Sequence, residues 1–435
     1  MENEKENEIG NEIGNNMKNN MKNDKGMKND KGMENDKRME SDKGNEVKNL
    51  DVFPRLIREK QEESLSPYAT RSRDSRGRIF PAEKCKVRTE FERDTGRILY
   101  SMEFRRLRHK TQVFFNPQND HICTRMEHVL YVNYISNTIA RSLNLNPDLV
   151  NAISLGHDIG HSPFGHSGEK MLNACIRKIE PELRFSHEQH SLRVADRLAL
   201  KHNKPDQLGF NLTFEVRDGI VCHCGEIYEE TILQPDRNKA SESIYNNATE
   251  DGSTDRTKMP ATLEGCVMRI ADKIAYVGRD IEDAIRTGIM DFEDIPKEIK
   301  SELGKTNGEI INTLVMDIIM NSMEKDMIML SKEKGMAMRD LLKENDDRIY
   351  KSDKIKAYEK MAKNTVEGLF DALIIAIEDF EKLRSSDTKV YNNLYDFITE
   401  RVYDADEKNA RKVVDFIAGM TDSYAQKCYE EIYWF

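Results

Sequence analysis

The distribution of histidine is the feature that most constrains how this chain can fold. All ten histidines of the 435 residues lie between His109 and His223. Imidazole is the commonest metal ligand in proteins, and neighbouring carboxylates orient it or bind the ion beside it. The densest part runs from Thr124 to Glu169 and contains the adjacent pair His157-Asp158. These observations predict a divalent-metal site that the fold must assemble around this stretch.

Two helix starts are predicted in this stretch. Thr124 is followed three residues later by Glu127, which is the spacing of a capping box. The run Asn146-Pro147-Asp148 combines an N-cap residue, a proline at the first helical position and an acid in the first turn. Adjacent side chains on a helix point about 100° apart. His157 and Asp158 can therefore reach one ion only near a helix end or kink, and Gly160 favours such a break.

A third ligand-bearing segment is predicted much later in the chain. Residues 264–287 have the pattern of one amphipathic helix that ends at Gly288. Asp272, Tyr276 and Asp280 recur every four residues on its polar stripe. If the stripe faces a pocket, it supplies one metal ligand and two groups that can bind hydroxyls. Periodicity alone is equally consistent with a solvated face.

The remaining sequence predicts an all-α fold in three parts. Residues 1–50 repeat a polar hexad, MKNDKG, and are predicted to be a disordered, low-complexity tail. Residues 51–295 are predicted to form the core, with a polar, mobile surface loop at 236–258. Residues 296–435 keep a helical pattern and are predicted to pack on the core as a C-terminal helical region.

Composition excludes several functional classes. A net charge of −11 argues against a protein that coats nucleic acid, although local basic patches stay open. There is no run of about 18 apolar residues that would span a membrane. Seven cysteines without a framework spacing, and no secretion signal, predict a cytoplasmic protein with free thiols. The Cys222-His223-Cys224 run lacks the second pair that a zinc site needs, so we place no ligand there.

The candidate residues suit phosphate-ester chemistry. His128, His157, Asp158 and one further acid form a mixed nitrogen and oxygen set, which favours one magnesium, manganese or iron ion over structural zinc. His161 and His166 are then spare imidazoles beside the ion. Glu169 lies three residues beyond His166 and can fix its tautomer, as a general acid requires.

Five ordered motifs resemble one family. The sequence HDIGHSPFGHSGE at 157–169 resembles the deoxyguanosine triphosphate triphosphohydrolase family, within the HD superfamily of metal-dependent phosphohydrolases. So do FRRLRHKTQVF at 104–114, TRMEH at 124–128, ADKIAYVGRDIEDA at 271–284 and IAGMTDSYA at 417–425. The resemblance covers the chain from about Arg71 onward. Ser162 replaces a second proline found in many relatives. The resemblance implies an HD-domain helical bundle with additional C-terminal helices, and hydrolysis of deoxynucleoside triphosphates (dNTPs) to deoxynucleoside and tripolyphosphate.

The resemblance also implies residue roles. It makes His128, His157, Asp158 and Asp272 the metal ligands, and it gives catalytic roles to His166, Glu169 and His187. His161, Arg125 and Lys273 would approach the phosphates, and the sugar would be read by Gln112, Tyr276 and Asp280. His223 would have a structural or substrate-side role.

Two alternatives stay open beside the dNTP triphosphohydrolase, for which dGTP is the expected substrate. One is an HD nucleotidase or phosphodiesterase acting on another nucleotide, against which the cations Arg125 and Lys273 argue. The other is a non-catalytic protein that senses dNTPs, against which the complete ligand set argues. Relatives are commonly homo-oligomers, often hexamers, and some have a nucleotide activator at a second site. Neither base preference nor the native metal follows from the sequence.

Overall fold

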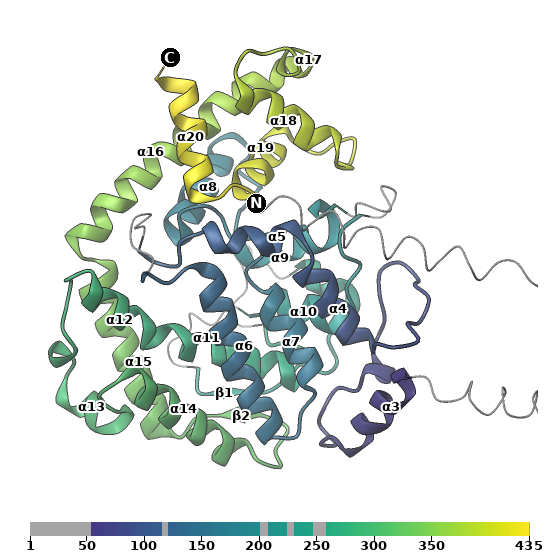
Figure 1. The fold of residues 1–435 in the computed structure, drawn as a ribbon, viewed down its shortest axis with the longest axis vertical. Helices are drawn as coiled ribbons and strands as arrows, with labels where there is room; N and C mark the ends of the chain where they lie inside the picture. Colours follow the sequence, from purple (N-terminus) through teal and green to yellow (C-terminus); the bar gives the residue numbers. More distant parts are fainter. Residues whose placement is uncertain (1–53, 115–120, 201–207, 224–229, 247–257, 435) are drawn as a thin grey trace, which may run out of the picture. The chain divides into compact units, whose positions relative to one another are not determined.

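The fold is built almost entirely from helices, which confirms the predicted all-α class (Figure 1). The structure is a computed structural model that describes residues 54–114, 121–200, 208–223, 230–246 and 258–434. These residues belong to one unit that begins at Pro54, and the predicted tail at 1–50 lies outside them. Within the described residues, strands are limited to one antiparallel pair, β1 (Ile232–Leu233) and β2 (Ile328–Met329).

The helices fall in two groups along the chain. The first group runs up to the polar insertion and comprises α3 (Pro54–Gln61), α4 (Glu90–Leu99), α5 (Met102–Arg106), α6 (Arg125–Ser142), α7 (Pro147–Gly156), α8 (Gly165–Ile179), α9 (His187–Arg193) and α10 (Phe214–Val221). The second group comprises α11 (Leu263–Val277), α12 (Arg279–Arg286), α13 (Lys297–Leu303), α14 (Asn307–Ser322), α15 (Lys332–Asn345), α16 (Asp353–Ala376), α17 (Phe380–Leu383), α18 (Lys389–Thr399), α19 (Asn409–Ala418) and α20 (Asp422–Tyr433).

Both predicted helix starts are confirmed. The Thr124 hydroxyl accepts a hydrogen bond from the Glu127 amide, and the Glu127 carboxylate accepts one from the Thr124 amide at 2.7 Å, which completes the capping box of α6. The Asn146 side chain accepts from the Asp148 amide at 3.0 Å, and Pro147 is the first residue of α7. Each cap satisfies helix amides that have no partner within the helix.

The prediction of one helix over 264–287 is wrong. The segment breaks at Gly278 into α11 and α12. A Cβ atom at Gly278 would lie 2.3 Å from the side-chain oxygen of Asn307, the first residue of α14, so only glycine allows this close packing. Asp272 and Tyr276 therefore lie on α11, whereas Asp280 lies on α12.

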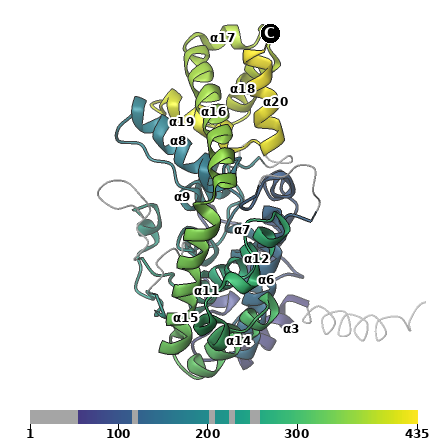
Figure 2. The ribbon, with the colours of Figure 1, turned by 90° about the vertical axis from the view of Figure 1, so that its left-hand side faces the viewer.

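Two large apolar cores and one small apolar cluster (Leu192, Phe214, Val221, Cys222, Ile244 and Ala261) lie within the described residues. The first contains residues from Ala69 to Ile355, and α6, α7, α10 and α11 pack on one another within it. The second combines α8 with the later helices from Ala362 onward. The long α16 begins in the first core and continues into the second (Figures 1 and 2). Helices α13 to α15 thus belong to the first core, although the sequence pattern places the start of the C-terminal region at 296.

The described part of the polar insertion packs against the first group of helices. The Lys239 ammonium is buried and donates to Asp218 at 2.7 Å, and Ile244 is fully buried. The sequence pattern predicts a mobile surface loop over 236–258, but residues 236–246 are anchored by these contacts. Residues 247–257 lie outside the described residues. Among the described helices, none is long and apolar enough to cross a membrane.

Candidate active site

Three helices bring the four predicted metal ligands together. His128 lies on α6, His157 and Asp158 follow the end of α7, and Asp272 lies on α11. The His128 Nε2 atom is 2.9 Å from an Asp272 oxygen, and the His157 Nε2 atom is 4.0 Å from that same oxygen and 3.5 Å from an Asp158 oxygen. We call these four residues the ligand cluster. Helix α7 ends at Gly156, so His157 and Asp158 lie at a helix end, as their adjacency requires.

The His157 ring is oriented as a ligand would be. Its Nδ1 atom donates to the Ser154 carbonyl at 2.7 Å, which leaves the lone pair on Nε2. That Nε2 atom is buried and receives no hydrogen bond from the described residues. Burial lowers the pKa of His157 to about 4, although Asp158 opposes the shift. The imidazole is therefore neutral at physiological pH and can donate its lone pair to a cation.

The two carboxylates of the ligand cluster are ionised. Burial alone would raise the pKa of Asp272, but a hydrogen bond from His128 and the charge of that ring lower it to about 2. Burial likewise opposes ionisation of Asp158, but His157 and Arg125 hold its pKa well below the usual range. Two buried carboxylates beside imidazole nitrogens suit a divalent cation with oxygen and nitrogen ligands. The donor set thus fits the predicted ion.

Arg125 holds one of these carboxylates in place. Its guanidinium donates to Asp158 at 2.6 Å, to the Gln112 carbonyl at 3.2 Å and to the Thr111 carbonyl at 3.3 Å. Only 2% of the Arg125 surface is exposed, so its positive charge lies inside the protein, next to Asp158. Arg125 was predicted to approach the phosphates, and in the structure its guanidinium contacts Asp158.

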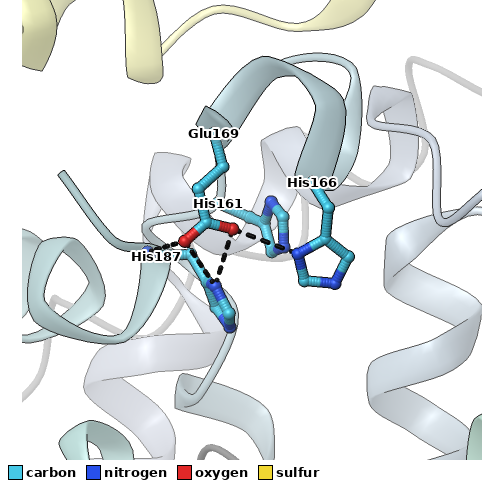
Figure 3. Close-up of side chains that lie close together, drawn as sticks. All are labelled: His161, His166, Glu169 and His187. Carbon is cyan, nitrogen blue, oxygen red and sulfur yellow. Dashed lines mark hydrogen bonds and ion pairs between the residues drawn. The ribbon is translucent and has the colours of Figure 1, made fainter. Parts of the chain in front are cut away.

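A second group of side chains lies close together on and near α8 and α9 (Figure 3). The Glu169 carboxylate bridges two imidazoles, at 3.1 Å from His166 Nδ1 and 3.0 Å from His187 Nδ1. The His161 ring stacks on His187 with a centroid separation of 4.5 Å. We call His161, His166, Glu169 and His187 the imidazole cluster. All four were predicted as site residues, and the fold brings them together.

The imidazole cluster contains both a charged and a neutral ring. Burial disfavours the charged form of His187, but Glu169 and Glu188 raise its pKa to about 10. Burial would raise the pKa of Glu169, but His187 and His166 hold it well below the usual range. In contrast, burial and the nearby charge of Arg125 keep the pKa of His161 well below its usual value. His187 is therefore a buried cation, whereas His161 is neutral.

His223 links the two clusters. Its Nε2 atom is 3.2 Å from His187 Nε2 and 4.0 Å from an Asp158 oxygen. Its Nδ1 atom donates to the Ile220 carbonyl, so its Nε2 atom can accept a hydrogen bond from the second N–H group of His187. The sequence placed no ligand in this run. The family resemblance predicted a structural or substrate-side role for His223, and Cys224 lies outside the described residues.

Gly160 fixes the position of α9 against the His157-Asp158 turn. A Cβ atom at Gly160 would lie 2.2 Å from the Ser191 amide nitrogen, so a larger residue would displace α9. The Gly160 amide donates to the Ser191 hydroxyl at 3.0 Å, and its carbonyl accepts from His190 at 2.7 Å. Because α9 also carries His187, this contact sets the distance between the two clusters.

The remaining predicted residues have mixed environments. The Gln112 side-chain oxygen is buried and accepts no hydrogen bond from the described residues. Asp280 is buried and accepts from the Tyr350 hydroxyl, and burial raises the pKa of Asp280 to about 6. Tyr276 is half-buried on α11 and packs on the first core. Sequence reasoning had no means to identify Tyr350, because it lies 70 residues from Asp280.

Lys273 is already bound to an acid. Its ammonium is completely buried and donates to Glu230 at 3.1 Å, and Arg269 donates to the same carboxylate at 2.8 Å. Lys273 therefore already has an acidic partner inside the protein. Like Arg125, it was expected to approach the phosphates.

Comparison with known proteins gives consistent matches. The family model described as the HD domain matches residues 125–277, and that of the phosphohydrolase-associated domain matches residues 328–431. A deoxyguanosinetriphosphate triphosphohydrolase-like protein of Caldanaerobacter subterraneus subsp. tengcongensis is 40% identical over 87% of this chain and 95% of the relative. Proteins with the same name are 36% identical in Desulfatibacillum aliphaticivorans (87% of this chain, 98% of the relative) and 35% identical in Clostridium tetani (85% and 93%).

Proposed function

Because the chain belongs to the family of deoxyguanosinetriphosphate triphosphohydrolase-like proteins in the HD superfamily, we propose that this phosphohydrolase cleaves dNTPs to deoxynucleoside and tripolyphosphate, with dGTP as a substrate. One observation carries the proposal: Asp158 of the ligand cluster and His187 of the carboxylate-bridged histidine pair lie close together around His223. Such a pairing places phosphate binding and proton transfer in one site.

One divalent ion per site, magnesium, manganese or iron, would be held by His128, His157, Asp158 and Asp272. The unpartnered Nε2 atom of His157 and the two ionised carboxylates fit such an ion. When bound, the ion supplies positive charge for phosphate oxygens and makes water more acidic.

His166 is the proposed general acid. Its Nδ1–H donates to Glu169 at 3.1 Å, which leaves Nε2 to carry the transferable proton, and its side chain is 48% exposed to solvent. In the reaction, a water oxygen bonds to the α-phosphorus and releases a proton to solvent, the bond between this phosphorus and the sugar 5′-oxygen breaks, and protonated His166 donates a proton to that oxygen. His187 stays protonated and attracts the phosphate oxygens, and the neutral His161 stacks on it.

The sugar would be bound by Gln112, Tyr276 and Asp280. The buried, unpartnered oxygen of Gln112 supports its part, because a ligand hydroxyl could satisfy it. The structure offers less discrimination against other nucleotides than the sequence predicted. Arg125 and Lys273 are engaged with Asp158 and Glu230, so neither supplies a free cation for a triphosphate. An HD nucleotidase or phosphodiesterase is therefore the second candidate.

Product analysis separates these candidates. The full-length protein is incubated with dGTP and Mn²⁺ or Mg²⁺, with EDTA as the metal-free control. We expect deoxyguanosine and tripolyphosphate. Formation of only dGMP and pyrophosphate, or of dGDP and phosphate, would contradict the proposal. Binding of dGTP without any turnover, unchanged in His166→Ala, would favour a dNTP-sensing protein.

A substrate panel tests the finer parts of the proposal. Four dNTPs and four ribonucleotides, each alone and in pairs, report on sugar choice, base choice and activation by a second nucleotide. Size-exclusion chromatography with light scattering in the same buffers tests the proposed homo-oligomer.

A further inference from the structure

A cavity of about 320 Å³ lies apart from the ligand and imidazole clusters. It is bounded by α9 and the residues on either side of it, by the described part of the insertion, and by α19 with the turn before it. None of the eight residues of the two clusters lines it. Its volume is within the range of pockets that bind small molecules.

The charged lining of the cavity is dominated by arginine. Four arginines and two acids contribute to the wall: Arg184, Arg193, Arg197, Arg411, Asp196 and Glu407. Burial lowers the pKa of the nearby His190, so this ring adds no positive charge at neutral pH. Arginine forks bind phosphate and carboxylate oxygens through paired hydrogen bonds.

Most of these charges already have partners inside the protein. Arg193 donates to Asp415 at 2.8 Å and to Glu407 at 2.8 Å. Asp196 accepts from Arg217 at 2.7 Å, and Arg197 pairs with Asp404. The acids on the wall are thus neutralised by arginines and do not repel an incoming anion.

Arg411 is the exception. Its guanidinium forms no hydrogen bond or ion pair with the described residues, although the side chain is partly buried on α19. Burial lowers the pKa of Arg411, and the nearby charge of Asp415 opposes this shift. A partly buried cation without a direct partner is unfavourable unless an anion or water satisfies it.

We propose that this cavity binds the phosphate group of a small molecule, with Arg411 as the main donor. The apolar wall, which includes Phe185, Leu192 and Ile244, would contact the uncharged part of the ligand. Arg184 adds further positive charge to the wall, which favours a doubly charged phosphate over a singly charged carboxylate. The proposal does not depend on the reaction at the ligand cluster.

Isothermal titration calorimetry at constant ionic strength tests the site. The full-length protein is titrated with inorganic phosphate and, separately, with ribose 5-phosphate. We expect Arg411→Gln to weaken binding at least about tenfold, the scale of one charge-assisted hydrogen bond. Arg141→Gln, which removes an exposed cation from α6, is the charge-matched control and should bind as the unmodified protein does. Tighter binding of ribose 5-phosphate indicates an organic phosphate, and tighter binding of inorganic phosphate indicates the free ion; either result supports the site.

Two further variants keep the test decisive. Asp158→Ala should bind both probes normally, because it alters only the ligand cluster; a loss of binding there would assign the phosphate to that cluster and overturn the proposal. Arg411→Lys keeps the charge without the planar fork, so we expect a smaller loss of phosphate affinity. This variant replaces Arg411→Gln if Arg411→Gln does not fold. Unchanged binding in the Arg411 variant, equal loss in Arg141→Gln, or no binding to the unmodified protein would also overturn it.

Discussion

The ligand cluster and the imidazole cluster both combine histidines with carboxylates but hold them in different charge states. In the ligand cluster, two carboxylates stay ionised and burial keeps His157 neutral. In the imidazole cluster, one carboxylate is shared by two rings. It raises the pKa of His187 to about 10, so this ring stays protonated at neutral pH. The comparison shows that burial and the placement of acids, and not the histidines themselves, decide which rings are neutral and which are charged.

One ring of the imidazole cluster is much more exposed to solvent than the other side chains of either cluster. The side chains of His157 and Asp158 are 1% and 3% exposed, whereas that of His166 is 48% exposed. A buried ligand set retains an ion by excluding competing water, while a proton donor needs contact with the substrate. Substitutions in the two clusters should therefore have separable effects on metal content and on turnover.

The largest effect is expected from Asp158→Ala. The variant loses one ionised ligand and leaves Arg125 without its 2.6 Å partner, so we expect both bound metal and dGTP hydrolysis to fall below detection. Metal content is measured by mass spectrometry after gel filtration, and products by chromatography. Asp148→Ala, which alters an acid in the first turn of α7, should keep both. Full turnover in Asp158→Ala would remove Asp158 from the ligand set.

His166→Ala should separate the clusters most clearly. The ring is half-exposed and lies outside the ligand cluster, so we expect the variant to fold and to keep its metal. Loss of the general acid should reduce kcat by roughly 10²–10⁴-fold. The same metal and product measurements apply. Loss of metal together with activity would mean that the two clusters form one site.

Arg125→Lys tests the link between positioning and metal binding. A lysine keeps the charge but cannot donate at once to Asp158 and to the Thr111 and Gln112 carbonyls. We expect metal affinity to fall by about 10–100-fold, as for other groups that orient a ligand. Competition with a chelator of known affinity measures this change. If metal affinity is unchanged and only KM for dGTP rises, Arg125 contacts the phosphates as first predicted.

Glu169→Gln should have the smallest effect, on stability and its pH dependence. Because folding raises the pKa of His187 to about 10, the Glu169–His187 pair stabilises the fold fully below about pH 6.5 and loses this effect as the pH rises through about 10. We expect the metal-free variant to be less stable by roughly 1.5–3 kcal/mol at pH 6, with the difference shrinking by pH 10. Urea unfolding at the two pH values measures it. A pH-independent difference would show that His187 is not held as a cation.

The sequence by itself determined the all-α class, the starts of α6 and α7, and the position of His157-Asp158 at a helix end. These features are local, because caps, periodicity and helix breaks depend on residues within a few positions of one another. The order of the motifs also indicated which distant segments share a site. Asp272 is an example, since it lies over a hundred residues after Asp158 and reaches His128 within 2.9 Å.

Only the tertiary structure decided which partner each side chain has. Asn307 approaches Gly278 and breaks the predicted helix, Glu230 binds Lys273, and Asp158 binds Arg125. His223 and the cavity at Arg411 likewise depend on helices that are remote in the chain. A charged side chain looks the same in the sequence whether it faces substrate or a buried counter-charge, because packing between distant elements sets its partner and its burial, and these set its pKa.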